Sequence, residues 1–370
     1  MAAPNPGLVS AERTLIGWRA GRLWTLATVA LTIAALVGAV ALAPTASASP
    51  SRGLAWLLFL GSSVHVAGTG WLYTLADVRR YARAHLSRYV WAPIGLVTGG
   101  GLAALLVPPA LFNWLLLPYF AWQFFHFQKQ NLGMAALAAS SRGVAGLRVV
   151  ERRAMTLSGI AGIAALMVRP GLLQLRVAPG LGDLFPLVAL MFAVAVAVGV
   201  WSLTRRRSED RPLGFSVVYL VSLCFSLPVF AFTSPYAAVG GMTVAHGLQY
   251  LLLVSLIAAG RQGGARRVVG LVAFCNVALL GGGALSVASH LHGGDAVERC
   301  LFGGYLGVVM AHFVIDAGIW RLRDPFPRQF IAGHVPYLLA PPKSPAGHPV
   351  DDRSSSDIDC ARGAILIHRQ

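Results

Sequence analysis

Ten apolar segments, each of about 20 residues, run through almost the whole of this chain of 370 residues. A helix needs roughly 20 apolar residues to cross about 30 Å of hydrocarbon, so segments of this length predict transmembrane helices. They lie at residues 22–44, 53–76, 90–107, 113–137, 154–173, 181–203, 213–233, 236–259, 268–290 and 300–320. Since 56% of all residues are hydrophobic and only 12% are charged, the sequence predicts an all-α fold, a polytopic transmembrane helical bundle with about ten spans.

The basic residues gather in alternate loops between these segments. Of the 30 lysines and arginines, Lys129 lies within a span and only four lie in the loops of one side, namely Arg52, Arg169, Arg176 and Arg299. This asymmetry predicts a multi-pass protein of the plasma membrane with both termini in the cytoplasm. Anionic lipid headgroups account for the net charge of +16, so we expect the lipid bilayer as a partner and no nucleic acid.

The sequence predicts three regions: a cytoplasmic N-terminal segment (1–21), a transmembrane helical domain (22–330) and a disordered cytoplasmic tail (331–370). The first apolar run spans about 21 residues, which is longer than the roughly 7 to 15 of a secretory signal, so we expect a retained anchor. The tail is rich in proline, serine and aspartate and cannot bury enough apolar surface to fold. No glycine-rich phosphate loop or Walker sequence is present, which argues against nucleotide-driven transport.

Glycines occur in short groups within the predicted spans. Gly99 to Gly101 and Gly281 to Gly283 are the clearest of these groups. Small residues let transmembrane helices approach closely, so we expect both groups to form helix-packing surfaces.

Four histidines, His65, His126, His246 and His312, each lie near the middle of a different predicted span. Those spans all run in the same direction, and each histidine lies 10 to 13 residues from the outer end, or roughly 15 to 20 Å deep. Ionisable side chains at this depth are costly unless they face the protein interior, which makes them candidates for a functional site. Their common depth predicts one shared metal centre bound by neutral imidazoles.

Polar residues at helical spacing accompany each histidine and should face the same interior. Metal-bound imidazoles usually donate their other N–H to a nearby acceptor, and the groups placed for this are Asp316, Gln123, Gln249, Tyr250 and Thr69. Lys129 follows His126 by three residues, and Asp316 follows His312 by four. We expect Lys129 and Asp316 to neutralise each other, because either charge alone in hydrocarbon is costly.

At these histidines the chain resembles the bacterial Brp/Blh family of membrane β-carotene dioxygenases. His126-Phe127 with Gly133 is similar to a His-Phe-Gly segment of that family, and His312 with Asp316 to a late His-x-x-x-Asp segment. His65 with Gly68 is a weaker counterpart of an early His-Gly motif. Where the family has two histidines four residues apart, this chain has His246 and then Tyr250.

The resemblance implies an enzyme, a non-haem iron oxygenase in which Fe(II) bound by histidines activates dioxygen. Its substrate would be a lipophilic polyene or isoprenoid reached from the lipid. Aromatic residues on the fourth span are candidates for the wall of such a pocket: Trp114, Tyr119, Phe120, Trp122, Phe124, Phe125 and Phe127.

Two other classes are compatible with the same residues. A haem-binding membrane redox or haem-modifying protein would use the histidines as two axial pairs. A transporter would use Lys129 and Asp316 as intramembrane coupling charges beside the histidines, and it would show discontinuous helices and an inverted repeat. Di-iron desaturases are disfavoured, because the chain contains no HxxxH or HxxHH sequence.

Overall fold

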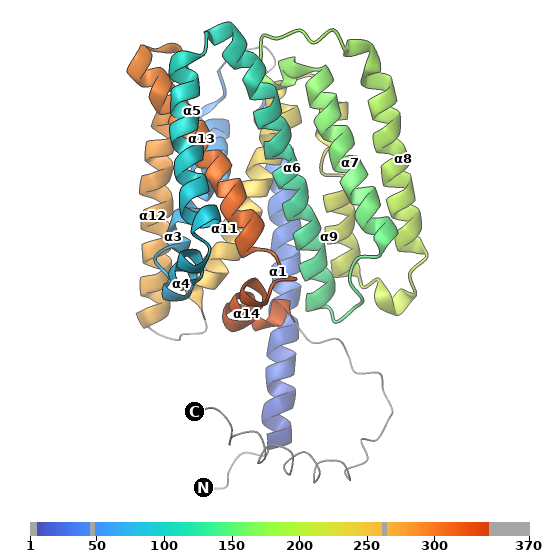
Figure 1. Ribbon diagram of the computed structural model, residues 1–370. Helices are drawn as coiled ribbons and strands as arrows, with labels where there is room; N and C mark the ends of the chain where they lie inside the picture. Colours follow the sequence, from blue (N-terminus) through green and yellow to red (C-terminus); the bar gives the residue numbers. More distant parts are fainter. Residues whose placement is uncertain (1–5, 45–48, 261–264, 340–370) are drawn as a thin grey trace, which may run out of the picture.

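The computed structural model describes residues 6–44, 49–260 and 265–339. All regular structure in these residues is helical, without β-strands, and the long helices stand side by side as one bundle (Figure 1). The elements are α1 (Pro6–Leu42), α2 (Arg52–Phe59), η1 (Leu60–Val64), α3 (His65–Leu72), α4 (Ala76–Ala84), η2 (Ser87–Trp91), α5 (Ala92–Leu106), α6 (Pro109–Ser141), α7 (Val149–Val168), η3 (Pro170–Leu173), η4 (Gly182–Leu184), α8 (Phe185–Thr204), η5 (Ser208–Asp210), α9 (Leu213–Leu223), α10 (Leu227–Ala231), η6 (Tyr236–Gly240), α11 (Gly241–Ala259), α12 (Ala265–Ser289), η7 (Leu291–Gly293), α13 (Ala296–Ile319), α14 (Pro325–His334) and η8 (Pro336–Leu338).

Seven helical stretches in the described residues are long and apolar enough to cross a membrane, which indicates a membrane protein. They are Arg19–Leu42, Arg52–Leu72, Ser87–Leu106, Gly182–Thr204, Tyr236–Ala259, Ala265–Gly293 and Ala296–Ile319. The other three predicted spans are also helical, but α6 carries a polar run around His126 and α9 has only 11 residues. The all-helical membrane fold is therefore as expected, whereas ten spans and two cytoplasmic termini stay predictions.

Helix α11 forms the centre of the bundle. In its apolar stretch 72% of the residues are buried, against 17% to 28% in those of α1, α5, α8 and α12. The outer helices instead expose large apolar side chains such as Leu106, Leu187 and Leu280. A bundle with an apolar outer surface suits lipid as its solvent.

Close helix contacts in this bundle depend on glycine. A Cβ atom on Gly100 of α5 would collide with the backbone of Gly303 in α13, and one on Gly282 of α12 would collide with Val64. Four glycines of the two predicted groups lie at helix contacts, as expected: Gly100, Gly101, Gly281 and Gly282. The other two, Gly99 and Gly283, have open space around them. Small residues bring these helices closer together than larger side chains would allow.

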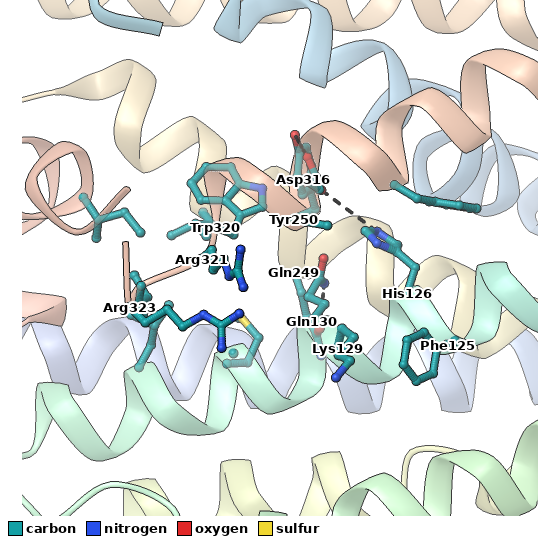
Figure 2. Close-up of a pocket in the computed structure, with 18 of the residues that line it drawn as sticks. Phe125, His126, Lys129, Gln130, Gln249, Tyr250, Asp316, Trp320, Arg321 and Arg323 are labelled. Atoms are coloured by element: carbon teal, nitrogen blue, oxygen red, sulfur yellow. Dashed lines mark hydrogen bonds and ion pairs between the residues drawn. The ribbon is translucent and has the colours of Figure 1, made fainter. Parts of the chain in front are cut away.

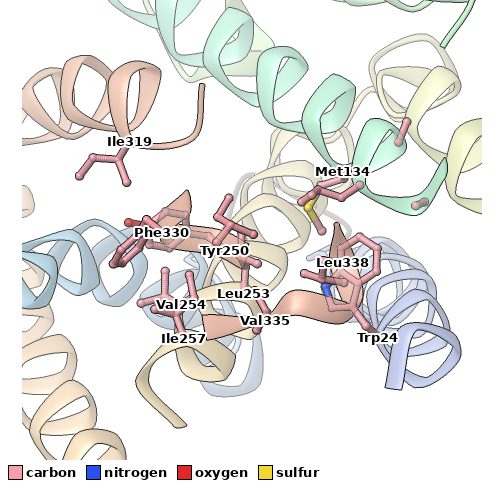
Figure 3. Close-up of a cluster of buried hydrophobic side chains, with 14 of the residues drawn as sticks. Trp24, Met134, Tyr250, Leu253, Val254, Ile257, Ile319, Phe330, Val335 and Leu338 are labelled. Atoms are coloured by element: carbon pink, nitrogen blue, oxygen red, sulfur yellow. The ribbon is translucent and has the colours of Figure 1, made fainter. Parts of the chain in front are cut away.

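The C-terminal end of the described chain is folded, contrary to the prediction that disorder begins at residue 331. Helix α14 continues to His334, and Phe330, Ile331, Val335 and Leu338 are buried. Figure 3 shows this segment packed among side chains of α1, α6, α11 and α13. The amphipathic character of α14 was hidden by the prolines around it, and the rest of the predicted tail, 340–370, lies outside the described residues.

A buried ion pair joins α7 to the loop after α8. Nε of Arg206 donates to Oε1 of Glu151 at 2.7 Å, and both side chains are almost fully buried. The same guanidinium donates to the backbone oxygens of Ala145 and Gly146. Arg206 was expected to be one basic loop residue among others, but here it fixes the α6–α7 connection to α8.

Replacing Glu151 by glutamine should lower the free energy of unfolding by about 3 to 5 kcal/mol, because it leaves a buried guanidinium without a counter-charge. The measurement is reversible denaturation in detergent. The matched control is Glu209→Gln, which removes only the exposed partner of Arg207 and should leave stability unchanged. A stability equal to that of the wild type for Glu151→Gln would show that the pair is dispensable.

Candidate metal centre

The four histidines come from four separate helices and meet in the interior of the bundle. His65 begins α3, and His126, His246 and His312 lie within α6, α11 and α13, all of them buried. In the cycle His65, His246, His126, His312 and back to His65, each neighbouring pair of rings has its centroids 5.0 Å apart. The four rings, here called the histidine cluster, therefore surround one point.

Local backbone features bring His65 and His246 together. A Cβ atom on Gly247 of α11 would overlap the backbone of Gly61, so only glycine permits this approach. Between Gly61 and His65 the chain forms the wide π-helical turn η1. Such a turn adds one residue to the helix and rotates everything that follows, and π-turns are frequent at functional sites. The turn therefore determines the direction in which His65 points.

The histidine cluster contains buried nitrogens without partners. In the part of the chain that the structure describes, Nε2 of all four histidines is buried and accepts or donates no hydrogen bond. The same holds for Oδ2 of Asp316. Folded proteins satisfy more than about 90% of their buried polar groups. With Nδ1 of His65 and of His246, the cluster has seven such atoms. So many exceptions in one place indicate a site for a shared partner, and lone pairs of nitrogen and oxygen are ligands for a metal cation.

Asp316 lies closer to this point than expected. Its Oδ2 is 3.6 Å from Nε2 of His312 and 4.0 Å from Nε2 of His126. Asp316 was expected to accept from the second N–H of a metal-bound imidazole. Instead its Oδ2 lies on the Nε2 side of His312, while Thr69 contacts Nδ1. Asp316 is therefore itself a candidate ligand.

Two overlapping sets of ligand atoms are close enough for a metal ion. One set is His65, His246 and His312, and the other is His126, His312 and Asp316; within each set the atoms lie within 4.8 Å of one another. Ligands at about 2.1 Å from a common ion can be at most about 4.2 Å apart. Binding therefore requires only small side-chain movements, and His312 belongs to both sets.

Hydrogen bonds from Thr69 and Tyr250 define the protonation of His312. The Tyr250 hydroxyl donates to Oδ1 of Asp316 at 3.3 Å, so it accepts from the Thr69 hydroxyl at 2.7 Å. Thr69 Oγ1 must then accept from Nδ1 of His312, 2.6 Å away. A neutral imidazole with its proton on Nδ1 has its lone pair on Nε2, which is the nitrogen that faces the centre. Thr69 thus bonds to a histidine ring, as expected for it, whereas Tyr250 reaches the ring only through Thr69.

Aromatic rings cover the histidine cluster where hydrogen bonds do not. Phe127 stacks on His246 with ring centroids 4.0 Å apart, and Phe313 stacks on His126 at 4.6 Å. Phe127 was among the expected pocket residues, whereas Phe313, directly after His312, was not. The two phenyl rings fix the orientation of the imidazole rings and surround them with apolar atoms.

Gln249 holds helices together and makes no hydrogen bond to a histidine ring in the described part of the chain. Its Nε2 donates to Oγ1 of Thr32 in α1 at 2.8 Å, and its Oε1 accepts from Gln130 at 3.1 Å. Gln130 also donates to the backbone oxygen of His246 at 2.9 Å. Thr32 was not predicted; the signal was a row of three threonines at helical spacing in the first apolar span, Thr25, Thr28 and Thr32.

Lys129 and Gln123 do not take the roles expected of them. Within the described residues Lys129 forms no ion pair with Asp316; its side chain is exposed, with Nζ 5.0 Å from the centre of the Phe125 ring. The reason is helical geometry: His126 points inward, and Lys129 lies at the edge of the same helix. Gln123 is half-buried and forms no hydrogen bond within the part of α6 and its surroundings that the structure describes.

A cavity of about 450 Å³ adjoins the histidine cluster (Figure 2). His126 and Asp316 form its inner end, and α6, α11, α13 and α14 form its walls. Of the seven aromatic residues predicted for a pocket wall, only Trp122 and Phe125 line this cavity. The cavity gives a small molecule access to the two candidate ligands.

Comparisons with protein-family models, with curated proteins and with solved structures found no match to this chain.

Replacing Thr69 by valine should weaken metal binding by about 10- to 100-fold, the usual loss when a partner of a metal-bound histidine is removed. Valine cannot accept from Nδ1 of His312, so the tautomer and the ring orientation are no longer fixed. The measurement is titration of the metal-free protein with Fe(II) or Co(II) against a competing chelator. Thr98→Val, at an exposed threonine on α5, is the control, and equal affinities of the two variants would contradict this role of Thr69.

Proposed function

We propose that the protein is a membrane oxygenase in which the histidine cluster and Asp316 bind one ferrous ion and a lipophilic molecule is oxidised. The observation that carries the proposal is the meeting of four buried histidine rings from four helices, each with an Nε2 that has no hydrogen-bond partner among the described residues. Nothing in a purely structural role for these histidines would require their free nitrogens to face one point.

The ligand set suits a divalent first-row metal. Imidazole binds iron, copper, nickel and zinc, and a single carboxylate offsets part of the charge of the ion in an apolar interior. The choice of iron, and of an oxygenase, rests on the resemblance of the segments around His126 and His312 to the carotene dioxygenases. The identity of the metal and the reaction are therefore the parts of the proposal that need experiment first.

The residues of this chain would perform four tasks. The histidine cluster and Asp316 hold the ion, and Thr69 with Tyr250 keeps Nε2 of His312 directed at it. Phe127 and Phe313 exclude water from the imidazoles. Ferrous iron, when bound, supplies the activation of dioxygen, and cleavage of a carbon–carbon double bond would place one oxygen atom on each carbonyl product without any outside reductant.

The spacing of the rings argues against the haem alternative. Axial ligands of a haem lie on opposite faces of a porphyrin, whereas every neighbouring pair in the histidine cluster is 5.0 Å apart. A porphyrin between any two rings would overlap the other two. The transporter alternative relied on Lys129 and Asp316 as coupled charges, and their lack of an ion pair in the described residues gives it no support.

Protein purified in detergent and reconstituted with Fe(II) should contain about one iron per chain. Replacing His126 or His312 with alanine should reduce the iron content by at least tenfold, because each removes a ligand without a substitute nearby. Metal analysis measures the content. His334→Ala serves as the control, since the hydrogen bond that His334 forms among the described residues is to the backbone of its own helix.

Folding of each variant is checked by helical circular dichroism and by gel filtration, and His312→Gln provides a milder change if alanine prevents folding. Full iron content in both His126→Ala and His312→Ala would refute the metal centre. An intense haem absorption band in the purified protein would show that the histidines bind haem and not a single iron ion.

A further inference from the structure

The cavity beside the histidine cluster is charged at the end opposite the candidate ligands. Figure 2 shows Arg321 and Arg323 at one end, His126 at the other, and Lys129 along the wall between them. All three cations line the cavity, and Asp316 at the inner end is its only lining carboxylate within the described residues. The cavity therefore has a cationic end and a metal-ligand end.

Apolar side chains form most of the wall between these ends. Met134 and Leu137 come from α6, Leu253 from α11, Trp320 from the end of α13 and Ile331 from α14. Binding sites for small molecules are typically apolar with a few placed polar groups, and volumes of about 300 to 1,000 Å³ are usual. This cavity, of about 450 Å³, falls within that range and is mostly apolar. It differs in having three cationic side chains along its lining.

The cations are only partly neutralised by the protein. Arg321 has one carboxylate nearby, with Nη1 3.6 Å from Oδ2 of Asp324. Lys129 contacts the face of Phe125, which does not cancel its charge. A guanidinium has five donors in a planar fork that suits carboxylate or phosphate oxygens, so Arg321 can keep Asp324 and still donate to a ligand.

We propose that this cavity binds a lipophile with an anionic head group, a carboxylate or a phosphate, held by Arg321, Arg323 and Lys129. The apolar part of the molecule extends along Met134 and Leu253 toward His126. The proposal rests on the proposed function in one respect: it identifies the class of molecule presented to the metal centre. The anion site itself requires no metal.

Such a molecule can enter from the membrane. Trp122 and Phe125 line the cavity and are also partly exposed, at 37% and 39%. These two aromatic side chains of α6 therefore connect the cavity wall with the exposed apolar surface of the bundle, which is the side from which we expect a lipid to enter. A single-chain lipid would slide in sideways with its head group at the level of the arginines.

The test uses the whole protein in detergent and radiolabelled oleate as the probe, with equilibrium dialysis as the measurement. Replacing Arg321 and Arg323 together with glutamine should weaken oleate binding at least tenfold, since each loses a charge-assisted hydrogen bond. Lys129→Gln should weaken it less. Arg328→Gln, on the exposed side of α14 and outside the cavity lining, is the matched control and should bind like the wild type.

Competitors distinguish the chemistry and the source of the anion. Oleyl alcohol has the same chain without the charge and should compete poorly, and inorganic phosphate should compete only at far higher concentration than oleate. Phosphatidylglycerol in nanodiscs tests a membrane phospholipid: strong competition would assign the cavity to a phospholipid head group, and none would assign it to a single-chain acid. Equal binding of oleate and oleyl alcohol, or oleate binding unaffected by the double arginine variant, would overturn the proposal.

Iron content, measured on the same samples, separates this proposal from the previous one. The arginine variants should keep full iron while losing oleate. His126→Ala should lose iron while retaining oleate within about threefold. Loss of iron alone would therefore leave the anion site intact, and failure of the anion site would leave the metal centre intact.

Discussion

The whole arrangement depends on imidazole nitrogens that are buried without partners in an apolar bundle. Removing polar groups from water without hydrogen bonds costs free energy at each group, and here the four Nε2 atoms and Oδ2 of Asp316 share that cost at one point. The surrounding features all maintain this state: Gly61 and Gly247 bring two helices together, Thr69 fixes a tautomer, and Phe313 shields a ring. A bundle selected for stability alone would have apolar residues at these positions.

The helices and the meeting of the four histidines could be predicted from the sequence, because they depend on apolar segment length and on depth in the membrane. Apolar length located the helices, and equal depth brought His65, His126, His246 and His312 together, because spans of one direction place equivalent residues at one level. Rotation about each helix axis was harder to predict. Lys129 and Gln123 were assigned to the inner face by spacing alone, yet of these two and His126 only His126 is buried. The π-helical turn η1 also breaks the regular period before His65.

Interactions across large sequence separations were also beyond prediction. Thr32 bonds to Gln249 and Arg206 to Glu151, and neither pair has a local signal, since each partner looks like an ordinary residue of its own segment. The C-terminal boundary was misplaced for a similar reason. Proline-rich composition after residue 330 suggested disorder, but the burial of Val335 and Leu338 depends on surfaces supplied by α1 and α11.

The order in which the ligands occur along the chain has a consequence for biosynthesis. His65 lies near the start and His312 with Asp316 near the end of the described chain, and His312 belongs to both candidate ligand sets. A growing chain inserted from its N-terminus would contain His65, His126 and His246 long before α13 emerges from the ribosome. The proposed site can therefore form only after α13 has entered the membrane, and a chain that ends before α13 would lack His312 and Asp316, two of the five candidate ligands.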